Sequence, residues 1–300
     1  MEDLASLAED LFAHVEQPMT GPVASHVPGV HIYRSEQPVP RSPFVYQSGI
    51  IICLSGQKRI YAEGRTLAYN KDNYLSVGLP LVLECETYAS PEEPIMALVI
   101  DVDPVMLRDV AGGAGLLSEQ QSLRQAVETA PLPPEMADAV GRLLCLLASP
   151  TDSAVLGAGT VREIVYRALI GPAGAALQGL LNRDGHTARV AEVMQTLNAK
   201  FSDRITIDEM ARMAGMSASV FHRAFRQVTG DSPLQYLKKL RLTQASVLIV
   251  QQQVQIGTAA NAVGYESASQ FSRDFKSHFG VSAMDARRNG PNPVVAPSPD

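Results

Sequence analysis

The sequence lacks the features that define several large classes of protein. Three cysteines, Cys53, Cys85 and Cys145, are too few for a disulfide framework. No apolar run approaches the roughly 18 residues that a membrane span needs, and the acidic start Met1-Glu2-Asp3 lacks the basic residues of a secretory signal. With 46% hydrophobic residues, the chain is nevertheless far too apolar to be disordered. We expect a folded cytoplasmic protein with no membrane partner.

Signatures of catalysis are also missing. Residues 30–101 contain a single histidine, His31, and no His-x-His pair, so metal chemistry of the kind that needs clustered His and Glu ligands is not indicated. No P-loop, dinucleotide fingerprint or Ser/His/Asp arrangement stands out. We therefore expect no metal, no cofactor and no enzymatic activity.

The charge is small overall and unevenly spread. The 300 residues carry 25 Lys/Arg and 31 Asp/Glu, a formal net charge of −6, which taken alone disfavours a nucleic-acid partner. Residues 1–180 hold a balance of −10, however, whereas residues 181–300 hold +4. This asymmetry predicts two modules with different partners.

Hydrophobic periodicity divides the chain in the same way. Residues 4–16 have helical spacing, and residues 30–101 form seven short strand-like runs separated by Gly, Asn, Asp and Pro turns, a pattern typical of a small barrel or sandwich. The strands are expected at 30–34, 49–54, 57–62, 66–69, 74–77, 81–87 and 95–101. The later period is helical, with helices expected at 104–111, 119–129, 133–148, 153–170 and from about 188 to 287.

An internal repeat lies in the last third of the chain. The 16 residues from Ser217 to Ser232 align with those from Ser267 to Ser282, and eight of the sixteen positions are identical. Each copy predicts a short helix, a glycine turn (Gly215 or Gly264) and a second helix capped by serine. A polar, Arg-bearing face on the second helix is typical of the helix-turn-helix of DNA readers.

The repeat's polar residues suit the chemistry of base reading. Arg223 and Arg273 occupy the same register in the two copies, and Arg can donate two hydrogen bonds to guanine. A linker helix over 233–250 would be roughly 25 Å long, a rigid spacer that could set the two recognition helices near one DNA turn, about 34 Å, apart. A plain helical bundle with solvated arginines is the alternative interpretation, which the near-identical duplicate disfavours.

Residues 188–288 resemble the DNA-binding domain of the AraC/XylS transcription regulators. The resemblance rests on Arg223-Ala-Phe225, Thr229-Gly-Asp-Ser-Pro233, Arg241-Leu-Thr-Gln-Ala245, Gly264-Tyr265 and Phe271-Ser-Arg-Asp-Phe-Lys276. It departs from the family at Ala283 and Ala286, where Pro and Tyr are usual, and at Gly257, where a helix former is usual. The resemblance implies binding of double-stranded promoter DNA and a change in transcription, with RNA polymerase as a partner.

By the resemblance, Ser219, His222, Arg223, Ser269, Ser272 and Arg273 lie where family members contact bases, and further polar residues of the same region are added as expected contacts. Those expected to contact DNA are Ser219, His222, Arg223, Arg226, Ser269, Gln270, Ser272, Arg273 and Lys276. Those expected to contact the DNA backbone are Ser217, Lys238, Lys239 and Ser267. Because +4 is a modest charge for a DNA binder, affinity should rest on these few placed side chains and on helix N-termini.

The strand region resembles the sensor domain of one AraC subgroup. The resemblance rests on Pro28-Gly-Val-His-Ile-Tyr-Arg34, Ile51-Ile-Cys-Leu-Ser-Gly-Gln-Lys58 and Ser90-Pro-Glu-Glu-Pro94. It implies a cupin-like barrel that senses a small-molecule effector, or that mediates dimerisation.

Within such a barrel, the residues expected to line an effector pocket are Cys53, Tyr61, Tyr69 and Cys85. Ordinary core packing is the alternative for each of them, and a redox or electrophile sensor is a further alternative for Cys53 and Cys85. Cys145, within an apolar run, is expected to be packed. The helices of 104–180 either form a homodimer interface or cover the barrel.

The whole sequence predicts an α+β, two-domain transcription regulator. The expected parts are an N-terminal helical segment (1–24), a cupin-like sensor and dimerisation domain (25–180, with the barrel at 30–101 and helices at 104–180), a linker (181–187), an all-α domain with two helix-turn-helix motifs joined by a linker helix (188–288) and a disordered tail (289–300). It would act in the bacterial cytoplasm, at the nucleoid when bound to DNA. A cupin-type enzyme with a helical accessory domain and a nonspecific architectural DNA binder are the alternatives.

Overall fold

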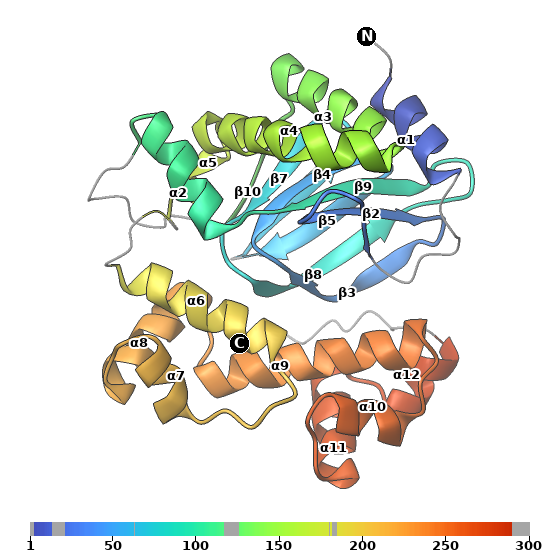
Figure 1. The fold of residues 1–300 in the computed structure, drawn as a ribbon. Coiled ribbons are helices and arrows are strands. Elements are labelled where there is room, and N and C mark those ends of the chain that lie inside the picture. Colours follow the sequence, from blue (N-terminus) through green and yellow to red (C-terminus); the bar gives the residue numbers. More distant parts are fainter. Residues whose placement is uncertain are drawn as a thin grey trace. The chain divides into compact units, whose positions relative to one another are not determined.

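The computed structural model describes residues 3–13, 22–62, 64–116, 126–179, 181 and 185–289. The chain forms two compact units. The first comprises residues 1–38, 47–79 and 87–183, and the second comprises residues 39–46, 80–86 and 184–300. Figure 1 shows that strands dominate the N-terminal part and that the C-terminal part is helical, which confirms the predicted α+β fold class. The predicted segments 14–16 and 119–125, most of the linker and the tail from 290 lie outside the described residues.

Two sheets build the strand region, in place of one closed barrel. The larger has the order β1-β2-β9-β4-β7-β10, and each strand runs antiparallel to its neighbours. Its strands are β1 (Val23–Ala24), β2 (Val30–Ser35), β9 (Ile95–Asp101), β4 (Gly49–Ser55), β7 (Asn73–Val77) and β10 (Val127–Pro131). The smaller has the order β3-β8-β5-β6, with β3 (Val39–Tyr46), β8 (Leu81–Tyr88), β5 (Gln57–Ala62) and β6 (Arg65–Asn70).

All seven predicted strands are present, and the structure adds three more. β3 escaped prediction because Pro40 and Pro43 interrupt its pattern; it lies at the edge of its sheet, where proline is tolerated because one side of an edge strand has no ladder to complete. β10 lies where the spacing predicted a helix over 119–129, so that expectation is wrong for residues 127–129. Pairing with β7 along residues 73–77 overrides the local pattern there.

The described residues of the first unit include five helices: α1 (Leu4–Phe12), α2 (Pro104–Gly113), α3 (Pro134–Leu147), α4 (Pro150–Ile170) and α5 (Gly174–Gln178). The Asp103 carboxylate caps α2 by accepting a hydrogen bond from the Met106 amide at 3.1 Å, with Pro104 in the first turn. Figure 1 shows α3 and α4 side by side as a helical hairpin along the six-stranded sheet. Buried side chains such as Leu143, Leu144 and Ile164 form the apolar face of this hairpin.

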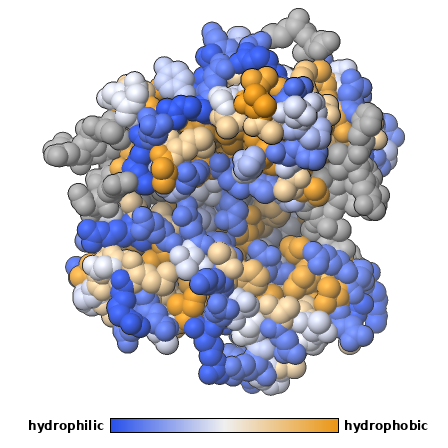
Figure 2. Space-filling model, in the orientation of Figure 1, coloured by the Kyte–Doolittle hydropathy of each residue, from blue (hydrophilic) through white to orange (hydrophobic). Residues whose placement is uncertain are grey.

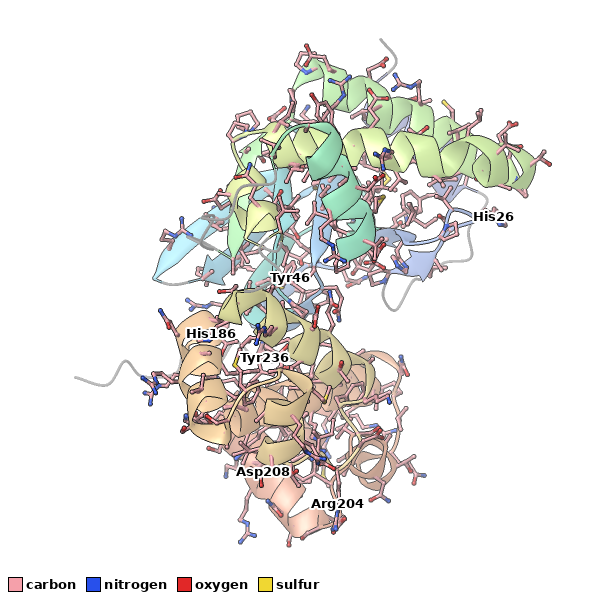
Figure 3. The ribbon with its side chains drawn as sticks, turned by 60° about the vertical axis from the view of Figure 1, so that its left-hand side comes forward. His26, Tyr46, His186, Arg204, Asp208 and Tyr236 are labelled. Atoms are coloured by element: carbon pink, nitrogen blue, oxygen red, sulfur yellow. The ribbon has the colours of Figure 1, made fainter. Side chains whose placement is uncertain are left out.

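The helical part of the second unit contains α6 (His186–Ala199), α7 (Ile207–Met213), α8 (Ala218–Thr229), α9 (Pro233–Ser246), α10 (Ile256–Ala262), α11 (Ala268–Phe279) and α12 (Ala283–Asn289). The end of α9 widens into one π-helical turn, Val247–Gln251, so the predicted linker helix over 233–250 is confirmed. Figure 3 shows Tyr236 within this helical unit, and its hydroxyl accepts a hydrogen bond from the Asn198 amide at 2.7 Å, which joins α9 to α6.

Candidate nucleic-acid interface

The first helix-turn-helix is fixed by local hydrogen bonds. Thr206 and Glu209 form a reciprocal capping box at the start of α7, in which the Thr206 amide donates to the Glu209 carboxylate at 2.8 Å. The chain then turns at Gly215, whose φ of +62° favours glycine. Ser217 caps α8, and Gly230, with φ of +77°, ends it.

The second helix-turn-helix repeats these lengths and turn positions. The first helix of each motif has 7 residues and the second has 12. Gly264, with φ of +82°, makes the turn, Ser267 caps α11 and Gly280 ends it with φ of +72°. One difference is that α10 has no side-chain cap at its N-terminus, whereas α7 has the capping box.

Aromatic residues at helical spacing hold each reading helix against its neighbours. Phe221 and Phe225 on α8 are fully buried, and the Phe225 ring meets the Tyr236 ring of α9 at a centroid distance of 5.5 Å. On α11, Phe271 and Phe275 are equally buried, with ring centroids 5.5 Å apart. Because these side chains occupy one face of each helix, the opposite face is left to solvent.

That opposite face carries the predicted DNA-reading residues. All of them except His222 are exposed: Ser219, Arg223, Arg226, Ser269, Gln270, Ser272, Arg273 and Lys276. His222 is half-buried. The structure therefore gathers four of the nine on the outer surface of α8 and five on that of α11, with the polar tips clear of the aromatic core.

The two capping serines use their hydroxyls within the protein. The Ser217 hydroxyl accepts from the Val220 amide at 3.4 Å, and the Ser267 hydroxyl accepts from the Gln270 amide at 3.3 Å. Each lies at the first turn of a 12-residue helix, where unpaired backbone N–H groups favour an anion. Their side chains hold the helix ends that would face a phosphate.

The two lysines expected to contact the DNA backbone are paired with carboxylates. Lys238 lies 2.6 Å from Asp274 of α11, and Lys239 lies 2.8 Å from Asp231 in the turn after α8. Each pair therefore ties the linker helix to one of the two motifs. The Lys238 pair is extended by Tyr265, whose hydroxyl donates to Asp274 at 3.3 Å.

Arg241 connects three segments of the helical unit, a role that the sequence motif did not disclose. Its guanidinium donates to the carbonyl oxygens of Phe201 at 2.7 Å, Asp203 at 2.8 Å and Gly264 at 3.4 Å. Burial lowers the pKa of Arg241, although the side chain stays charged at neutral pH. The clamp brings the segment before the first motif against the turn of the second.

An exposed ion pair accompanies the Arg241 clamp. Arg204, before α7, pairs with Glu266, before α11, and Figure 3 shows Arg204 at the edge of the helical unit. Sequence reasoning missed both partners because they are about 60 residues apart and neither lies in a motif. An ion pair this exposed contributes at most about 1 kcal/mol.

The structure accommodates the three residues, Gly257, Ala283 and Ala286, at which the chain departs from the family motif. Ala283 and Ala286 are buried in the core around Phe271, Phe275 and Phe279. Ser282 caps the final helix, since its hydroxyl accepts from the Asp285 amide at 3.1 Å. A Cβ at Gly257 would meet no neighbouring atom, so this glycine affects only helix propensity.

The residues predicted for the effector pocket do not share one surface. Tyr61 pairs with Thr66 and Tyr69 with Lys58, and because strand residues alternate between faces, Tyr61 and Tyr69 lie on opposite faces of their sheet. Tyr69 is 2% exposed and Tyr61 is half-buried. Only one of the two tyrosines can therefore line a cavity on a given side of the sheet.

The cysteines differ in exposure. Cys53 and Cys85 are buried, and burial raises the pKa of the Cys53 thiol to about 12, a change that disfavours the reactive thiolate. Cys145 is exposed, so the expectation that it packs in the core is wrong. The period of α3 explains this, because Leu143, Leu144 and Leu147 take the buried face and Cys145 falls outside it.

In the described ranges, no three His, Cys, Asp or Glu side chains are grouped in a way that could hold a metal ion. Across the same residues, no helix is both long enough and apolar enough to cross a bilayer.

Comparison with protein families places both halves of the chain. A family described as the N-terminus of AraC-type transcriptional regulators matches residues 26–176, and a helix-turn-helix domain matches residues 210–289. The chain belongs to the AraC-type transcriptional regulators. The resemblance inferred from the sequence motifs is thereby confirmed, for the sensor half as well as for the reader half.

Curated relatives match mainly the reader half of this regulator. The lactose operon transcription activator of Staphylococcus xylosus is 27% identical over 100 residues, 33% of this chain and 36% of the relative. GbdR of Pseudomonas aeruginosa is 30% identical over 109 residues, 36% of this chain and 30% of the relative. RhaS of Salmonella schwarzengrund is 27% identical over 151 residues, 50% of this chain and 53% of the relative. The matched region thus spans about a third to a half of these relatives.

Solved structures resemble the regulator over most of its length. Apo ToxT from Vibrio cholerae matches with a TM-score of 0.56 at 8% identity, covering 88% of this chain and 99% of ToxT. ToxT bound to an unsaturated fatty acid matches with a TM-score of 0.55 at 9% identity, covering 91% and 97%. At this level of sequence identity, the similarity shows only that the two proteins share a fold.

Proposed function

We propose that the protein is a sequence-specific, DNA-binding transcription regulator that reads double-stranded promoter DNA with α8 and α11. The observation that carries this proposal is the duplicated motif: two capped 12-residue helices, each with a buried aromatic face and an exposed polar face. The second helix of such a motif enters the major groove with residues near its N-terminus against the base edges.

The matched arginines are the strongest candidates for base recognition. Arg223 and Arg273 occupy the sixth position of α8 and α11 respectively, and both are exposed. A bidentate contact from arginine to guanine is worth about 1–3 kcal/mol of discrimination. Ser219, Ser269 and their neighbours would read or position the adjacent bases.

Phosphate contacts would come from several sources. The N-termini of α8 and α11 present unpaired backbone N–H groups capped by Ser217 and Ser267. Lys238 and Lys239 would have to share their charge with Asp274 and Asp231. We therefore expect Lys238 and Lys239 to contribute less to phosphate binding than the N-termini of α8 and α11.

The test is a binding experiment on selected DNA. We expect Arg223→Ala and Arg273→Ala each to lose about 5- to 150-fold of preference for the selected site over a scrambled one. Arg59→Ala is the matched control, because it removes one positive charge from an exposed position on β5, outside both readers. Retention of wild-type preference by both reading-face variants, or an equal loss in the control, would show that these helices do not read the bases.

The sensor half is proposed to bind a small-molecule effector that shifts the population of DNA-binding states. Support comes from the match to the AraC-type N-terminal family and from the ToxT fold, since a ToxT structure contains a bound unsaturated fatty acid. Within this proposal, buried Cys53, Tyr69 and Cys85 are candidate lining residues. Tyr61 would serve only if the pocket lay on the other side of its sheet.

Two further partners belong to the same proposal. Exposed apolar side chains on one stripe of α4, Val155 at 73% exposed, Tyr166 at 40% and Ile170 at 52%, suit a homodimer contact. Sedimentation of the purified protein would detect the homodimer, and Tyr166→Asp should then shift the dimer to monomer.

RNA polymerase would be contacted at the promoter, in the cytoplasm at the nucleoid. Membership of a regulator family favours this function over catalysis by a cupin-type enzyme.

A further inference from the structure

The first unit contains a groove that the proposed DNA interface does not use. It has a volume of about 1140 Å³ and lies among α1, the α3–α4 hairpin, the end of β4 and the turn before β7. α1 packs close to Gly141 of α3, since a Cβ there would be in ordinary van der Waals contact with the Leu4 side chain at 3.5 Å and the Leu7 side chain at 3.7 Å. Figure 1 shows the three helices that border it.

The floor and walls of the groove are apolar. Leu4 and Leu7 come from α1, Leu146 from α3 and Leu156 from α4, and Leu156 is 54% exposed. Figure 2 shows hydrophobic surface bordered by hydrophilic side chains over the region of α3 and α4. Ligand sites are typically apolar concavities of roughly 300–1000 Å³ with a few charged groups at the edge, and the groove, at about 1140 Å³, is slightly larger than that range.

The edge of the groove is acidic. Four carboxylates and two basic groups line it: Asp3, Asp72, Asp138 and Glu163 against Lys71 and Arg142. Arg142 forms ion pairs with both Asp138 and Glu163, and Arg167 also pairs with Glu163, so the charges of these groups offset one another. Asp3 and Asp72 are the lining carboxylates outside these pairs. The edge has a formal charge of −2, in a stretch of chain, residues 1–180, that carries −10. A cation gains from this field and an anion loses.

We propose that the groove binds an amphipathic organic cation, with its apolar body against the leucines and its amine beside Asp3 and Asp72. Of the residues predicted for the effector pocket, Cys53 also lines this groove, whereas Tyr61, Tyr69 and Cys85 do not. None of the groove's lining residues belongs to α8 or α11, so its test can fail or succeed independently of the proposed DNA recognition.

The protein contains its own reporter for the test. Cys145 lines the groove and is exposed, whereas Cys53 and Cys85 are buried. A water-soluble aromatic disulfide should therefore react first at Cys145 in the folded protein. A molecule seated on the leucines should slow that reaction.

Decylammonium and decanoate, below their micelle concentrations, are the matched probes, because they share an alkyl chain and differ in the sign of the head group. We expect decylammonium to protect Cys145 of the full-length protein in a saturable way, and decanoate to protect it much less. Asp3→Asn with Asp72→Asn should weaken decylammonium binding roughly two- to fivefold per carboxylate. Asn is itself a good N-cap, so the first change preserves the cap of α1.

A filling variant tests the place of binding. A Cβ at Gly159, which lines the groove, meets no atom within 4 Å, so Gly159→Leu should fold and occupy the space. We expect this change to weaken decylammonium binding, measured by calorimetry, by about tenfold or more. Gly113→Leu is the matched control, because Gly113 is equally open but lies on α2 and does not line the groove.

Three outcomes would overturn the proposal. They are equal protection by decanoate, protection that survives Gly159→Leu, and protection of Cys145 that depends on protein concentration without any added probe. The last outcome would assign the groove to a second copy of the chain. Saturable protection by the cation alone, lost in Gly159→Leu and kept in Gly113→Leu, would establish the site.

Discussion

The two turn glycines of the duplicated motif differ in their surroundings, and we predict that they differ in their tolerance of a methyl group. A Cβ added at Gly264 would lie 2.2 Å from the Ser202 carbonyl oxygen, far inside van der Waals contact. A Cβ at Gly215 would meet nothing closer than the Arg189 guanidinium at 3.7 Å. Both positions have positive φ, +82° and +62°, so the backbone penalty is similar.

The magnitude follows from separating the two contributions. A left-handed backbone conformation costs an alanine about 1–2 kcal/mol, and this applies to both variants. Overpacking costs about 1–3 kcal/mol more, and this applies only to Gly264→Ala, where the segment after α6 must move. We expect destabilisation of about 1–2 kcal/mol for Gly215→Ala and about 2–5 kcal/mol for Gly264→Ala.

The assay should resolve the two motifs separately. Hydrogen exchange read by mass spectrometry on the full-length protein reports the opening free energy of α10–α12 and of α7–α8 in one experiment. In Gly264→Ala, the displaced segment should also weaken the clamp from Arg241 to Phe201 and Gly264, so both motifs should lose protection. Equal losses in the two alanine variants would refute the argument from close backbone approach.

Two further predictions concern single residues of the helical unit. Gln253 has φ of +56°, and its side-chain amide donates to the Val250 carbonyl oxygen at 2.8 Å, so in Gln253→Gly the relief of the left-handed backbone is offset by the lost hydrogen bond and by the greater freedom of the unfolded chain. The free energy of unfolding should therefore change by less than about 1 kcal/mol, and a larger change in urea melts would contradict this. Burial, aided by Lys239 and Lys238 and opposed by Asp231, lowers the pKa of His278 to about 4. Because the unfolded chain protonates near pH 6.5 and the folded chain does not, stability should fall as the pH drops from about 6.5 to 4, and His278→Phe should flatten urea-melt midpoints over that range.

Much of the reader half could be predicted from sequence because its signals are local. Ser217 and Ser267 cap the start of a helix, and Gly230 and Gly280 end it. Phenylalanines four residues apart indicate the buried face. Each of these relations operates within one or two helical turns, so the chain near a residue fixes its environment. The duplication then confirmed the pattern, since the same cap, turn and aromatic spacing occur twice.

The strand region was predicted less completely because strand pairing is a long-range decision. Seven runs were recognisable from alternation and turn residues, but β3 contains two prolines and β10 lies in a stretch with helical spacing. Their strand conformation depends on the partners beside them: β10 pairs with residues 73–77, about 50 positions earlier in the chain. No window of local sequence contains that information.

The sequence by itself determined that this protein carries two capped helix-turn-helix motifs and a sensor-like strand region, because caps, turns and periodicity are properties of neighbouring residues. Only the tertiary structure decided that Lys238 and Lys239 are paired with Asp274 and Asp231, that Tyr61 and Tyr69 face opposite ways, and that Cys145 borders a groove. The physical reason is the same in each case: charge pairing, sheet register and exposure depend on residues that are distant in the chain and close in space.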